Sequence, residues 1–553
     1  MDTCVLGLGC FQAAKVSKGR EQGTSWPLCT APANVLRPIS CTAARQQHAL
    51  RLQRLSAMTM TTVSPEDLFP DPHGPDTLAV DLQTSLTLGT DALVVEDARD
   101  QGNGAACCGL SRAGSTPGVI MSLPFAHILW AEHADEGHVT VEYAQLMANQ
   151  AVCPATLRYS LDKPHSGRCG AWVERLLARA YGASQQRKRV KVLINPFGGQ
   201  GAARKTYYKA IAPVFAAARC VVDVEETRHH GHAVEIARQL DIDAYDVVAC
   251  ASGDGVPHEV WNGLGQRADA ARALVKLAVA QLPCGTGNAL SLNFNGTDNP
   301  SAAALAVVKG LRTPLDLASI TQGDHRTLSF LSQSVGIVAE ADLATEHLRW
   351  MGSARFTWGF LVRLLGKTVY PADIAVNVER ENKAAVREAY RAEASAPPPP
   401  PDPRPLPAPT AGLPALQYGT INDPLPSSWE LIPHDHLGNF YAGNMAYVSS
   451  AANFFPASLP SDGCLDLVRI RGDIARHTAV QTLLSVGSHT FFDLEHVDYQ
   501  KVSAYRIIPR AKGDGYISID GERAPFEPFQ CEVHRGLGTV LSKSGHLCEA
   551  RGV

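Results

Sequence analysis

Three glycine-rich turns, each between a β-type run and a helical pattern, constrain the fold of this chain more than any other feature. The runs KRVKVLINP, YDVVACASG and KLAVAQLPCG are apolar, and they lead into turns at Asn195–Gly201, Ser252–Gly255 and Gly285–Asn288. Strands that alternate with helices predict an α/β layer with a parallel sheet. Because ligands bind at the carboxyl ends of such strands, we expect the three turns to converge on one crevice.

Each turn, taken alone, has both a functional and a structural interpretation. Glycines permit positive φ and let backbone N–H groups surround an anion, while a following helix N-terminus favours negative charge. The turn at Asn195–Gly201 is neither a Walker A loop nor a G-x-G-x-x-G fingerprint, and a tight structural turn explains it equally well. Asp254 stands between two glycines after a strand, where a phosphate and a hydroxyl can both approach it. A structural turn carboxylate is the alternative.

The remaining sequence predicts a chain of several parts. Short β-type runs without a helical pattern precede the α/β region, and strand-rich segments after Asp316 indicate an antiparallel, β-sandwich-like lobe. The expected parts are a disordered or targeting-like tail at 1–75, a small β-rich module at 76–165, an α/β domain at 187–317, a β-rich lobe at 318–381 and 428–545, and a proline-rich disordered insertion at 382–427.

Two of these parts have alternative interpretations. The insertion contains APPPPPDPRPLPAPTAG, which is expected to be solvated because proline removes ladder donors, although an SH3 or WW ligand is the alternative. The first 63 residues carry seven Lys/Arg and two Asp/Glu. A transit-like segment, a true start at Met58 or Met60, and a disordered tail all fit this composition, and disorder is favoured.

Composition narrows the function classes. The formal net charge of −4 gives no reason to expect nucleic-acid binding. Fourteen cysteines without C-x-x-C pairs favour a reducing, intracellular compartment. No run of about 18 consecutive apolar residues is present, so a transmembrane helix is not expected, and any membrane substrate has to be reached from the membrane surface.

The order and spacing of the motifs resemble a known family. N-P-x-G-G-x-G, S-G-D-G-x-x-H-E-x-x-N-G-L and L-P-x-G-x-G-N-A-L look like the diacylglycerol-kinase-type catalytic domain. The stretches from Ser329 to Phe356, from Phe440 to Val468 and from Ile517 to Val533 narrow the resemblance to sphingosine (long-chain base) kinases, especially the fungal members. It covers about Lys191 to Val540 without the insertion, and the β-rich module loosely resembles the amino-terminal lobe of larger members.

The resemblance implies a fold and a reaction. The fold is an α/β nucleotide-binding lobe plus an antiparallel β-sandwich-like lipid-binding lobe, with the small β-rich N-terminal module. The reaction is ATP- and Mg²⁺-dependent phosphorylation of the primary hydroxyl of sphingosine, dihydrosphingosine or phytosphingosine to the 1-phosphate. A cytoplasmic enzyme peripherally associated with membranes is expected. A ceramide or diacylglycerol kinase and an inactive lipid-binding scaffold are the alternatives.

The resemblance also implies roles for individual residues. Asp254 would accept the proton of the lipid hydroxyl, and Mg²⁺ would be held through ATP phosphates and water near Asp520 and Glu522. Only Thr227 is carried over from its segment, because the residues after it depart from the family pattern. The implied nucleotide contacts are Asn195, Pro196, Phe197, Thr227, Glu259, Gly285, Thr286, Gly287, Arg349, Arg355, Asp520, Gly521 and Glu522. The implied substrate contacts are Ser252, Gly253, Asp254, Gly255, Ser332 and Asp342.

Asp342 is the residue expected to select the substrate. It matches the family aspartate that recognises the sphingoid head, and a buried carboxylate needs a cation or donors such as that head offers. Ceramide and diacylglycerol carry no cation, so an unpaired Asp342 would cost about 1–3 kcal/mol or more with them. The alternatives are a helix N-cap role for Asp342 and, for Arg349 and Arg355, solvated surface positions.

Overall fold

The computed structural model divides the chain into Met1–Pro70 and Asp71–Val553, and the structure describes residues only in the second unit. The predictions for the N-terminal tail up to residue 73, and for Arg349, therefore lie outside the described residues. The described residues are 74–81, 83–97, 119–134, 137–161, 166–198, 201–345, 348, 354–366, 368–396, 402, 404–510, 515–545 and 552–553.

The β-rich module consists of two antiparallel sheets and a helix. Alternating burial along the strands, such as the BiBiB pattern of Thr84–Leu88, gives each sheet one apolar face. The helix α1 (Ser166–Tyr181) packs against β5. One sheet is β1 (Thr77–Ala79), β2 (Thr84–Leu88), β3 (Ala92–Asp97) and β4 (Val119–Pro124), and the other is β5 (Ile128–Ala134), β6 (His138–Leu146) and β7 (Val152–Ser160).

The α/β region contains the parallel strands that the sequence predicted. Val247–Ser252 and Ala278–Pro283 are buried at every residue, as expected for strands covered on both faces, and Arg189–Ile194 is buried except at its first residue. Val221–Glu226, at the edge of the sheet, is exposed or half-buried. The strands β8 (Arg189–Ile194), β9 (Val221–Glu226), β10 (Val247–Ser252) and β11 (Ala278–Pro283) pair in the order β11-β10-β8-β9. The helices are α2 (Ala203–Thr206), α3 (Ala212–Ala217), α4 (His232–Gln239), α5 (Gly255–Gly265), α6 (Ala270–Lys276), α7 (Ala289–Asn295) and α8 (Pro300–Lys309).

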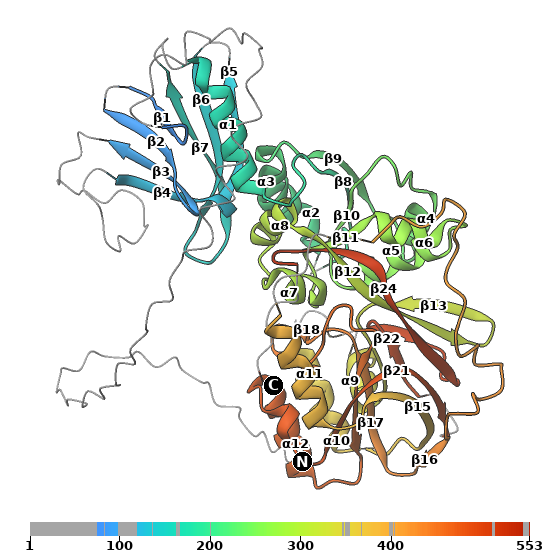
Figure 1. Ribbon diagram of the computed structural model, residues 1–553. Helices are drawn as coiled ribbons and strands as arrows, with labels where there is room; N and C mark the ends of the chain where they lie inside the picture. The colour runs from blue at the N-terminus through green and yellow to red at the C-terminus, as the bar shows by residue number, and fades with distance from the viewer. Residues whose placement is uncertain are drawn as a thin grey trace, which may run out of the picture. The chain divides into compact units, whose positions relative to one another are not determined.

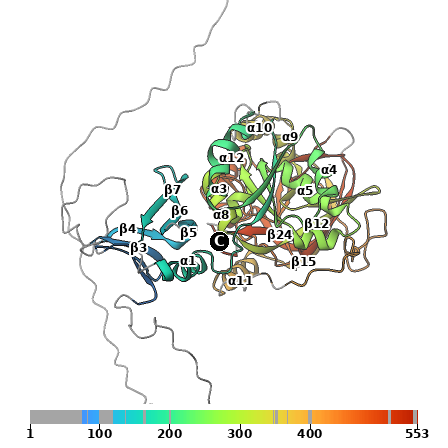
Figure 2. The same cartoon turned by 90° about the horizontal axis from the view of Figure 1, so that it is seen from above.

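Helices α4 and α5 lie side by side (Figure 1 and Figure 2). A Cβ at Gly263 of α5 would lie 2.5 Å from the Val234 carbonyl oxygen of α4. Glycine at this position therefore permits the close approach of the two helices. This packing places Val234, in the first turn of α4, against the last turn of α5.

The C-terminal region is antiparallel, but it is not a separate body. Its strands and the parallel strands form one sheet of 15 strands, in the order β23-β22-β14-β17-β20-β21-β24-β11-β10-β8-β9 with four more strands paired beside this path. The strands of this region are β12 (Leu311–Gln322), β13 (His325–Ser329), β14 (Ser332–Gly336), β15 (Ala372–Arg380), β16 (Ile432–His434), β17 (Leu437–Gly443), β20 (Leu465–Arg471), β21 (Val497–Pro509), β22 (Ile517–Ile519), β23 (Glu522–Ala524) and β24 (Phe529–Ser542), and β18 (Tyr447–Ser449) pairs only with β19 (Ala452–Asn453).

The long strand β24 joins the two regions (Figure 1). It pairs with β21 near Phe529 and with β12 along most of its length, and Val540 near its end pairs in parallel with Val279 of β11. The expected antiparallel strands are present, whereas this continuous hydrogen-bonded connection between the two regions was not predicted. The sites of both regions are consequently held on a common sheet.

The structure corrects the prediction of a disordered insertion at 382–427 for the residues it describes there. Asn382 caps a helix, α11 (Lys383–Ala394), by accepting a hydrogen bond from the Ala385 amide at 3.0 Å. Further on, Arg404 donates to the Gly538 carbonyl at 2.8 Å and to Thr539 Oγ1 at 2.6 Å. These contacts fasten the proline-rich segment to β24, because the Arg404 guanidinium supplies donors that its prolines, which lack an N–H, cannot supply.

Three further helices lie in the C-terminal region: α9 (Ile337–Leu343), α10 (Ala354–Leu364) and α12 (Arg476–Gly487). Their apolar residues form a cluster that includes Ile337, Leu364 and Ala479. None of the helices in the described part of the chain combines the length and the apolar composition that a membrane span requires.

Candidate active site

The turns after β10 and β11 touch each other through backbone atoms. A Cβ at Gly285 would lie 2.3 Å from the Cα of Gly253, and one at Gly287 would lie 2.6 Å from Oδ2 of Asp254. No side chain fits at either position, so glycine is required at 285 and 287 by this close approach. Asn288 closes the second turn, because its Oδ1 accepts from the Gly285 amide at 3.2 Å and its Nδ2 donates to the Gly285 carbonyl at 3.1 Å.

Asp254 lies in the first of these turns, immediately before α5, and its carboxylate lies beside the second. Its Oδ1 accepts hydrogen bonds from Gln281 Nε2 at 3.0 Å and from the Ala289 amide at 2.8 Å. Burial raises the pKa of Asp254 to about 6, although the hydrogen bonds oppose this effect. The carboxyl group is therefore oriented and has a pKa suited to exchanging a proton near neutral pH. Ser252, just before it, is buried and donates from Oγ to the Gly253 carbonyl at 2.7 Å.

The ends of β8 and β9 complete the edge of the sheet. The Asn195 amide donates to the Ala251 carbonyl at 3.2 Å, and the Thr227 amide donates to the Ile194 carbonyl at 2.8 Å. These bonds place Asn195 beside the end of β10, which leads into the Asp254 turn, and Thr227 beside the end of β8. The side chain of Asn195 accepts from the Phe197 amide at 3.0 Å, which leaves Phe197 76% exposed beyond Pro196. The predicted convergence of the strand ends is thus present.

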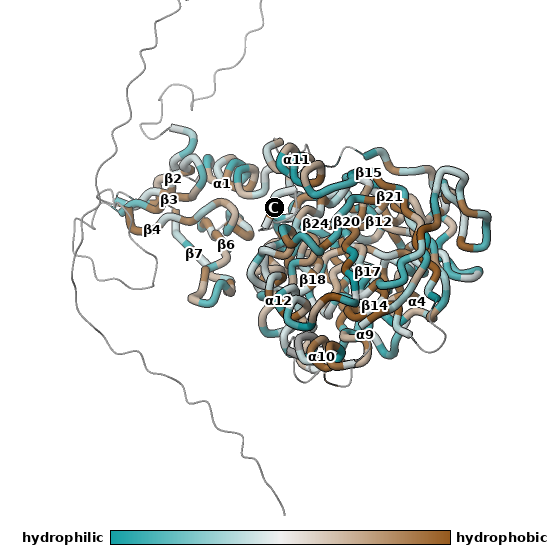
Figure 3. Tube along the Cα trace, turned by 90° about the horizontal axis from the view of Figure 1, so that it is seen from below, coloured by the Kyte–Doolittle hydropathy of each residue, from teal (hydrophilic) through white to brown (hydrophobic). Residues whose placement is uncertain are grey.

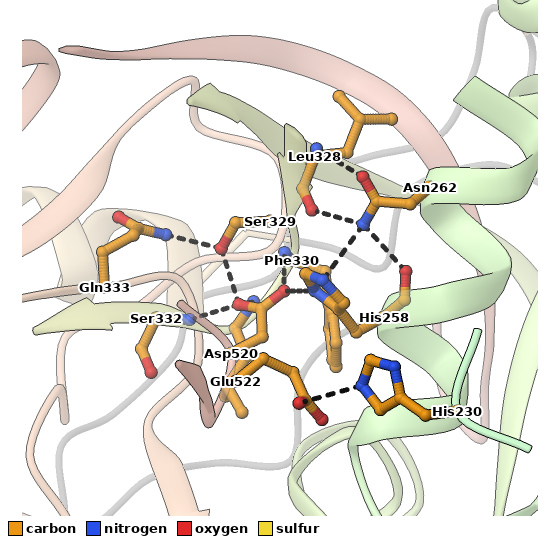
Figure 4. A network of polar contacts seen from close by, with 11 residues as sticks. His230, His258, Asn262, Leu328, Ser329, Phe330, Ser332, Gln333, Asp520 and Glu522 are labelled. Atoms are coloured by element: carbon orange, nitrogen blue, oxygen red, sulfur yellow. Dashed lines mark hydrogen bonds and ion pairs between the residues drawn. The ribbon is translucent and has the colours of Figure 1, made fainter. Parts of the chain in front are cut away.

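Asp520 is the centre of a polar network that joins the two regions (Figure 4). Its backbone has a positive φ of 54°, followed by Gly521 at 85°. The side chain is fully buried. Its carboxylate accepts from five groups: Ser329 Oγ at 2.6 Å, the amides of Phe330, Leu331 and Ser332 at 3.1, 3.0 and 2.9 Å, and His258 Nδ1 at 2.8 Å. A carboxylate with this many donors holds the 329–332 segment against α5.

His258 and Asn262 complete this network, and neither was among the predicted site residues. Burial lowers the pKa of His258, but the hydrogen bond and the charge of Asp520 outweigh it and raise the pKa above its usual value. Asn262, one turn along α5, exchanges hydrogen bonds of 2.9 Å in both directions with the backbone of Leu328. Their presence in the H-E-x-x-N motif was the available signal, but which partners they meet depends on how β13 crosses α5.

The two predicted glutamates lie on either side of the Asp254 turn. Glu522 Oε1 lies 2.9 Å from the position of a Cβ at Gly255, so the D-G-E turn packs directly on the first residue of α5. Its other oxygen, Oε2, lies 3.4 Å from His230 Nε2. Glu259 instead accepts from the Ala233 amide at 3.0 Å and so caps the first turn of α4. The structure brings Glu522 into the site and shows Glu259 at its border.

Asp342 lies on α9, next to the other side of the D-G-E turn. Its Oδ2 lies 3.9 Å from the position of a Cβ at Gly521, and its Oδ1 forms an ion pair of 3.1 Å with Arg355 Nη2 of α10. The expected candidate for a phosphate contact, Arg355, is thus paired with the expected head-group carboxylate. Neighbouring Glu340 pairs with Arg363 at 2.8 Å and does not compete for this place. Because Asp342 lies within α9, the alternative N-cap role is excluded.

Ser332 belongs to the same network, because its amide donates to Asp520, and the residue is 6% exposed. Its hydroxyl hydrogen-bonds with Tyr441, whose pKa is raised by burial, by nearby Asp342 and Asp520, and by Asp254. Asp254, Asp342 and Asp520 are thus all close enough to the Tyr441 hydroxyl to raise its pKa. Gly253, Gly255 and Thr286 lie in the turns described above.

An apolar cavity of about 250 Å³ is lined by residues of α9, the helix that carries Asp342. Helix α9 contributes Ile337 and Val338 to its wall, and α10 contributes Phe360 and Leu364. The opposite wall comes from β20 and α12, including Phe491 just beyond α12. The helices that carry Asp342 and Arg355 therefore also form the cavity, and a ligand with one charged end and one apolar chain matches this arrangement.

The residues present fit a nucleotide better than a metal held by protein alone. Glycines without room for side chains expose backbone donors at adjoining strand ends, which suits phosphates. The Asp520 carboxylate is already occupied by five donors, so of the two acids expected near Mg²⁺ only Glu522 offers a partly exposed carboxylate. A magnesium ion carried by phosphates and water is compatible with one such group.

Comparison with known proteins gives two family matches. Residues 189–320 match the diacylglycerol kinase catalytic domain, and residues 76–182 match a domain of unknown function (DUF7493). The first match begins at β8 and ends within β12, so it contains the turns that carry Asp254, Gly285 and Gly287. The second match covers the β-rich module and its helix α1.

Individual relatives extend the similarity over most of the chain. Sphingoid long chain base kinase 5 of Saccharomyces cerevisiae is 36% identical over 72% of this chain and 66% of that protein, so this chain spans about two thirds of its length. Sphingoid long chain base kinase 4 of Schizosaccharomyces pombe is 32% identical over 77% of this chain and 89% of that protein. Among solved structures, a diacylglycerol kinase from Bacillus anthracis covers 65% of this chain and 98% of its own at 17% identity, with a TM-score of 0.41.

Proposed function

This chain belongs to the family of sphingoid long-chain base kinases, and from that membership we propose that it phosphorylates the primary hydroxyl of a sphingoid base with ATP. One geometric observation carries the proposal. The D-G-E turn packs on the Asp254 turn through Glu522 and on Asp342 through Gly521. The proposed proton acceptor and the proposed head-group carboxylate thus lie on opposite sides of one turn, and the helix that carries Asp342 also lines an apolar cavity.

In the proposed reaction, Asp254 accepts the proton of the lipid hydroxyl while the hydroxyl oxygen forms its bond to the γ-phosphorus of ATP. The hydrogen bonds from Gln281 and Ala289 hold one carboxylate oxygen, and the other faces the Gly287 turn. ATP would supply the γ-phosphoryl group and leave as ADP when the bond from the γ-phosphorus to its bridging oxygen breaks. Glu522 would help to hold Mg²⁺ through phosphates and water, and this ion would supply positive charge for the phosphoryl group. The glycine turns and Glu522 position these groups, which is the main contribution of a protein to phosphoryl transfer. Asp520 acts through His258 and Ser332, so we regard it as a positioning residue.

The substrate is proposed to bind across α9 and α10. Its ammonium would approach Asp342 from the side of Gly521, because the other oxygen of the carboxylate already pairs with Arg355. Its hydrocarbon chain would enter the cavity between α9, α10 and α12. Burying each CH₂ contributes about 0.8 kcal/mol, so an apolar cavity contributes affinity while the carboxylate contributes selectivity.

Peripheral contact with a membrane is proposed through α10. Outward-facing apolar residues follow one side of this helix, where hydrophobic colouring is visible in Figure 3. Their exposed fractions are 54% for Trp358, 40% for Leu361, 37% for Val362 and 75% for Leu365 just after the helix. An apolar helix face beside the cavity would let a lipid pass from a bilayer into the site without crossing water.

The substrate assignment is tested with Asp342→Asn. Transfer of labelled γ-phosphate to dihydrosphingosine, ceramide and diacylglycerol in vesicles should be confined to dihydrosphingosine in the unchanged protein. The variant should show a KM for dihydrosphingosine raised about tenfold or more, because a hydrogen bond to a charged group contributes about 1.5–3 kcal/mol. Glu340→Gln on the same helix is the matched control, since its carboxylate pairs with Arg363, and it should keep the original KM.

Two outcomes would contradict this assignment. Transfer to ceramide or diacylglycerol by the unchanged protein would retain the kinase chemistry but remove the role of Asp342. Equal effects of the two substitutions would indicate that helix α9, and not its charge at 342, determines the affinity. Thermal unfolding of both variants separates these results from loss of folding.

The pKa of Asp254 predicts the acid limb of the pH profile. A base has to be ionised, and burial raises the pKa of this carboxyl to about 6. We therefore expect kcat/KM to be constant above about pH 7 and to fall about tenfold per pH unit well below pH 6. Initial rates between pH 5 and 8 at saturating ATP measure this limb. A profile that stays flat to pH 5 would contradict proton transfer to Asp254.

A further inference from the structure

A second cluster of ligand atoms lies outside the groups used above, where the chain enters α4. His229, His232 and Glu235 each offer one ligand atom, and these three atoms lie within 4.8 Å of one another. We propose that these residues form a binding site for a divalent transition metal such as Zn²⁺ or Co²⁺. The proposal rests on this local geometry and does not depend on the kinase function.

The backbone brings the three side chains together. His232 and Glu235 are three residues apart on α4 and therefore project from the same face of the helix. Gly231, with a φ of 83°, turns the preceding loop back over that face, and the His232 amide donates to the His229 carbonyl at 3.2 Å. The rings of His229 and His232 consequently lie with their centroids 5.0 Å apart.

Hydrogen bonding leaves a free lone pair on the His229 ring, whereas the lone pair of His232 Nδ1 is engaged by a backbone amide. His229 Nδ1 lies 3.0 Å from the His230 carbonyl, and because a carbonyl only accepts, Nδ1 carries the proton and Nε2 has the lone pair. A backbone carbonyl bound to the second ring nitrogen is the usual support of a metal-binding histidine. His232 Nδ1 accepts from the Arg228 amide at 3.3 Å, a long contact that a metal ion can replace.

The donor set selects the class of ion. Two imidazoles and one carboxylate suit Zn²⁺, Co²⁺ or Ni²⁺, whereas Mg²⁺ prefers oxygen ligands and retains its water. His229 and Glu235 are exposed, so solvent can supply a fourth ligand and an ion can enter without rearrangement of the core. The site is thus distinct in chemistry from the magnesium that accompanies ATP.

Its position would affect the candidate active site. His230, between the two histidine ligands in sequence, contacts Glu522 of the D-G-E turn, and the loop begins at Thr227 on the adjoining strand end. An ion that joins His229 to α4 would hold this loop in one conformation beside the nucleotide contacts.

The test is a titration of the full chain with Co²⁺, followed by d–d absorption, and with Zn²⁺ by calorimetry, both in millimolar Mg²⁺. His229→Gln and Glu235→Gln should each weaken the affinity of one equivalent of ion by at least about tenfold. The matched control is His230→Gln, which removes a neighbouring exposed histidine outside the cluster and should leave that affinity unchanged.

Three results would overturn the proposal. The first is equal affinity and stoichiometry in the unchanged protein and His229→Gln, since other histidines and cysteines would then hold the ion. The second is an equal loss in His230→Gln and His229→Gln, which would show nonspecific coordination by the loop. The third is a purely octahedral, weak cobalt spectrum unaltered by any of the substitutions. All three variants change exposed side chains, and their circular dichroism should match the unchanged protein.

Discussion

Replacing Asp254 with asparagine is expected to lower kcat for phosphoryl transfer to dihydrosphingosine by about 10²–10⁴-fold, the usual contribution of a general base. Asparagine has the same shape, and its side-chain oxygen can still accept from Gln281 and the Ala289 amide. Only the capacity to take up a proton is lost. The measurement is single-turnover transfer at saturating ATP, which separates chemistry from binding.

Stability provides the control for this substitution. The pKa of Asp254 is raised from 3.8 to about 6 in the folded state, so folding favours the protonated form. The folded protein therefore loses stability as pH rises from about 4 through 6, and at pH 7 the ionised carboxylate opposes folding. Asp254→Asn removes this cost, and its melting temperature at pH 7 should equal or exceed that of the unchanged protein. An inactive variant that also melts early would point to misfolding instead.

Asp520→Asn is expected to lower the free energy of unfolding by about 3–5 kcal/mol, as when one partner of a buried charged pair is removed. Each oxygen of Asp520 accepts at least two hydrogen bonds, so an amide NH₂ in either orientation would face donors. Asparagine tolerates a positive φ, so the backbone at φ 54° does not account for the loss. Denaturant unfolding measures the change.

A substitution at Glu522 distinguishes loss of the Asp520 hydrogen-bond network from a general disturbance of the D-G-E turn. Glu522→Gln alters the same D-G-E turn at a partly exposed carboxylate, and its unfolding free energy should change by less than about 1 kcal/mol. If Asp520→Asn were as stable as Glu522→Gln, the five donors around Asp520 would not be acting together. The pKa of His258, measured by NMR, should also fall in Asp520→Asn, because the hydrogen bond and charge of Asp520 raise it.

Local patterns were sufficient for much of the fold and for one side of the site. Buried apolar runs followed by glycine turns predicted the parallel strands and the meeting of their ends, because both follow from short-range chemistry. The capped helix α11 was missed although its signal was present: Asn382 precedes a run of helix formers in KAAVREAYRAEA. The prolines after this helix led to the prediction that all of 382–427 is disordered.

The partners of the site residues could not be read from local patterns. Asp520 lies 262 residues from His258 and 191 from Ser329, and only the pairing of β22 with β14 brings these groups together. Likewise, Arg355 was expected at a phosphate, whereas it pairs with Asp342 because α9 and α10 pack against each other. The amino-acid order alone specifies which residue types stand at the strand ends. Which of these residues share a hydrogen bond, an ion pair or a cavity depends on the fold, because those interactions join segments far apart in the chain.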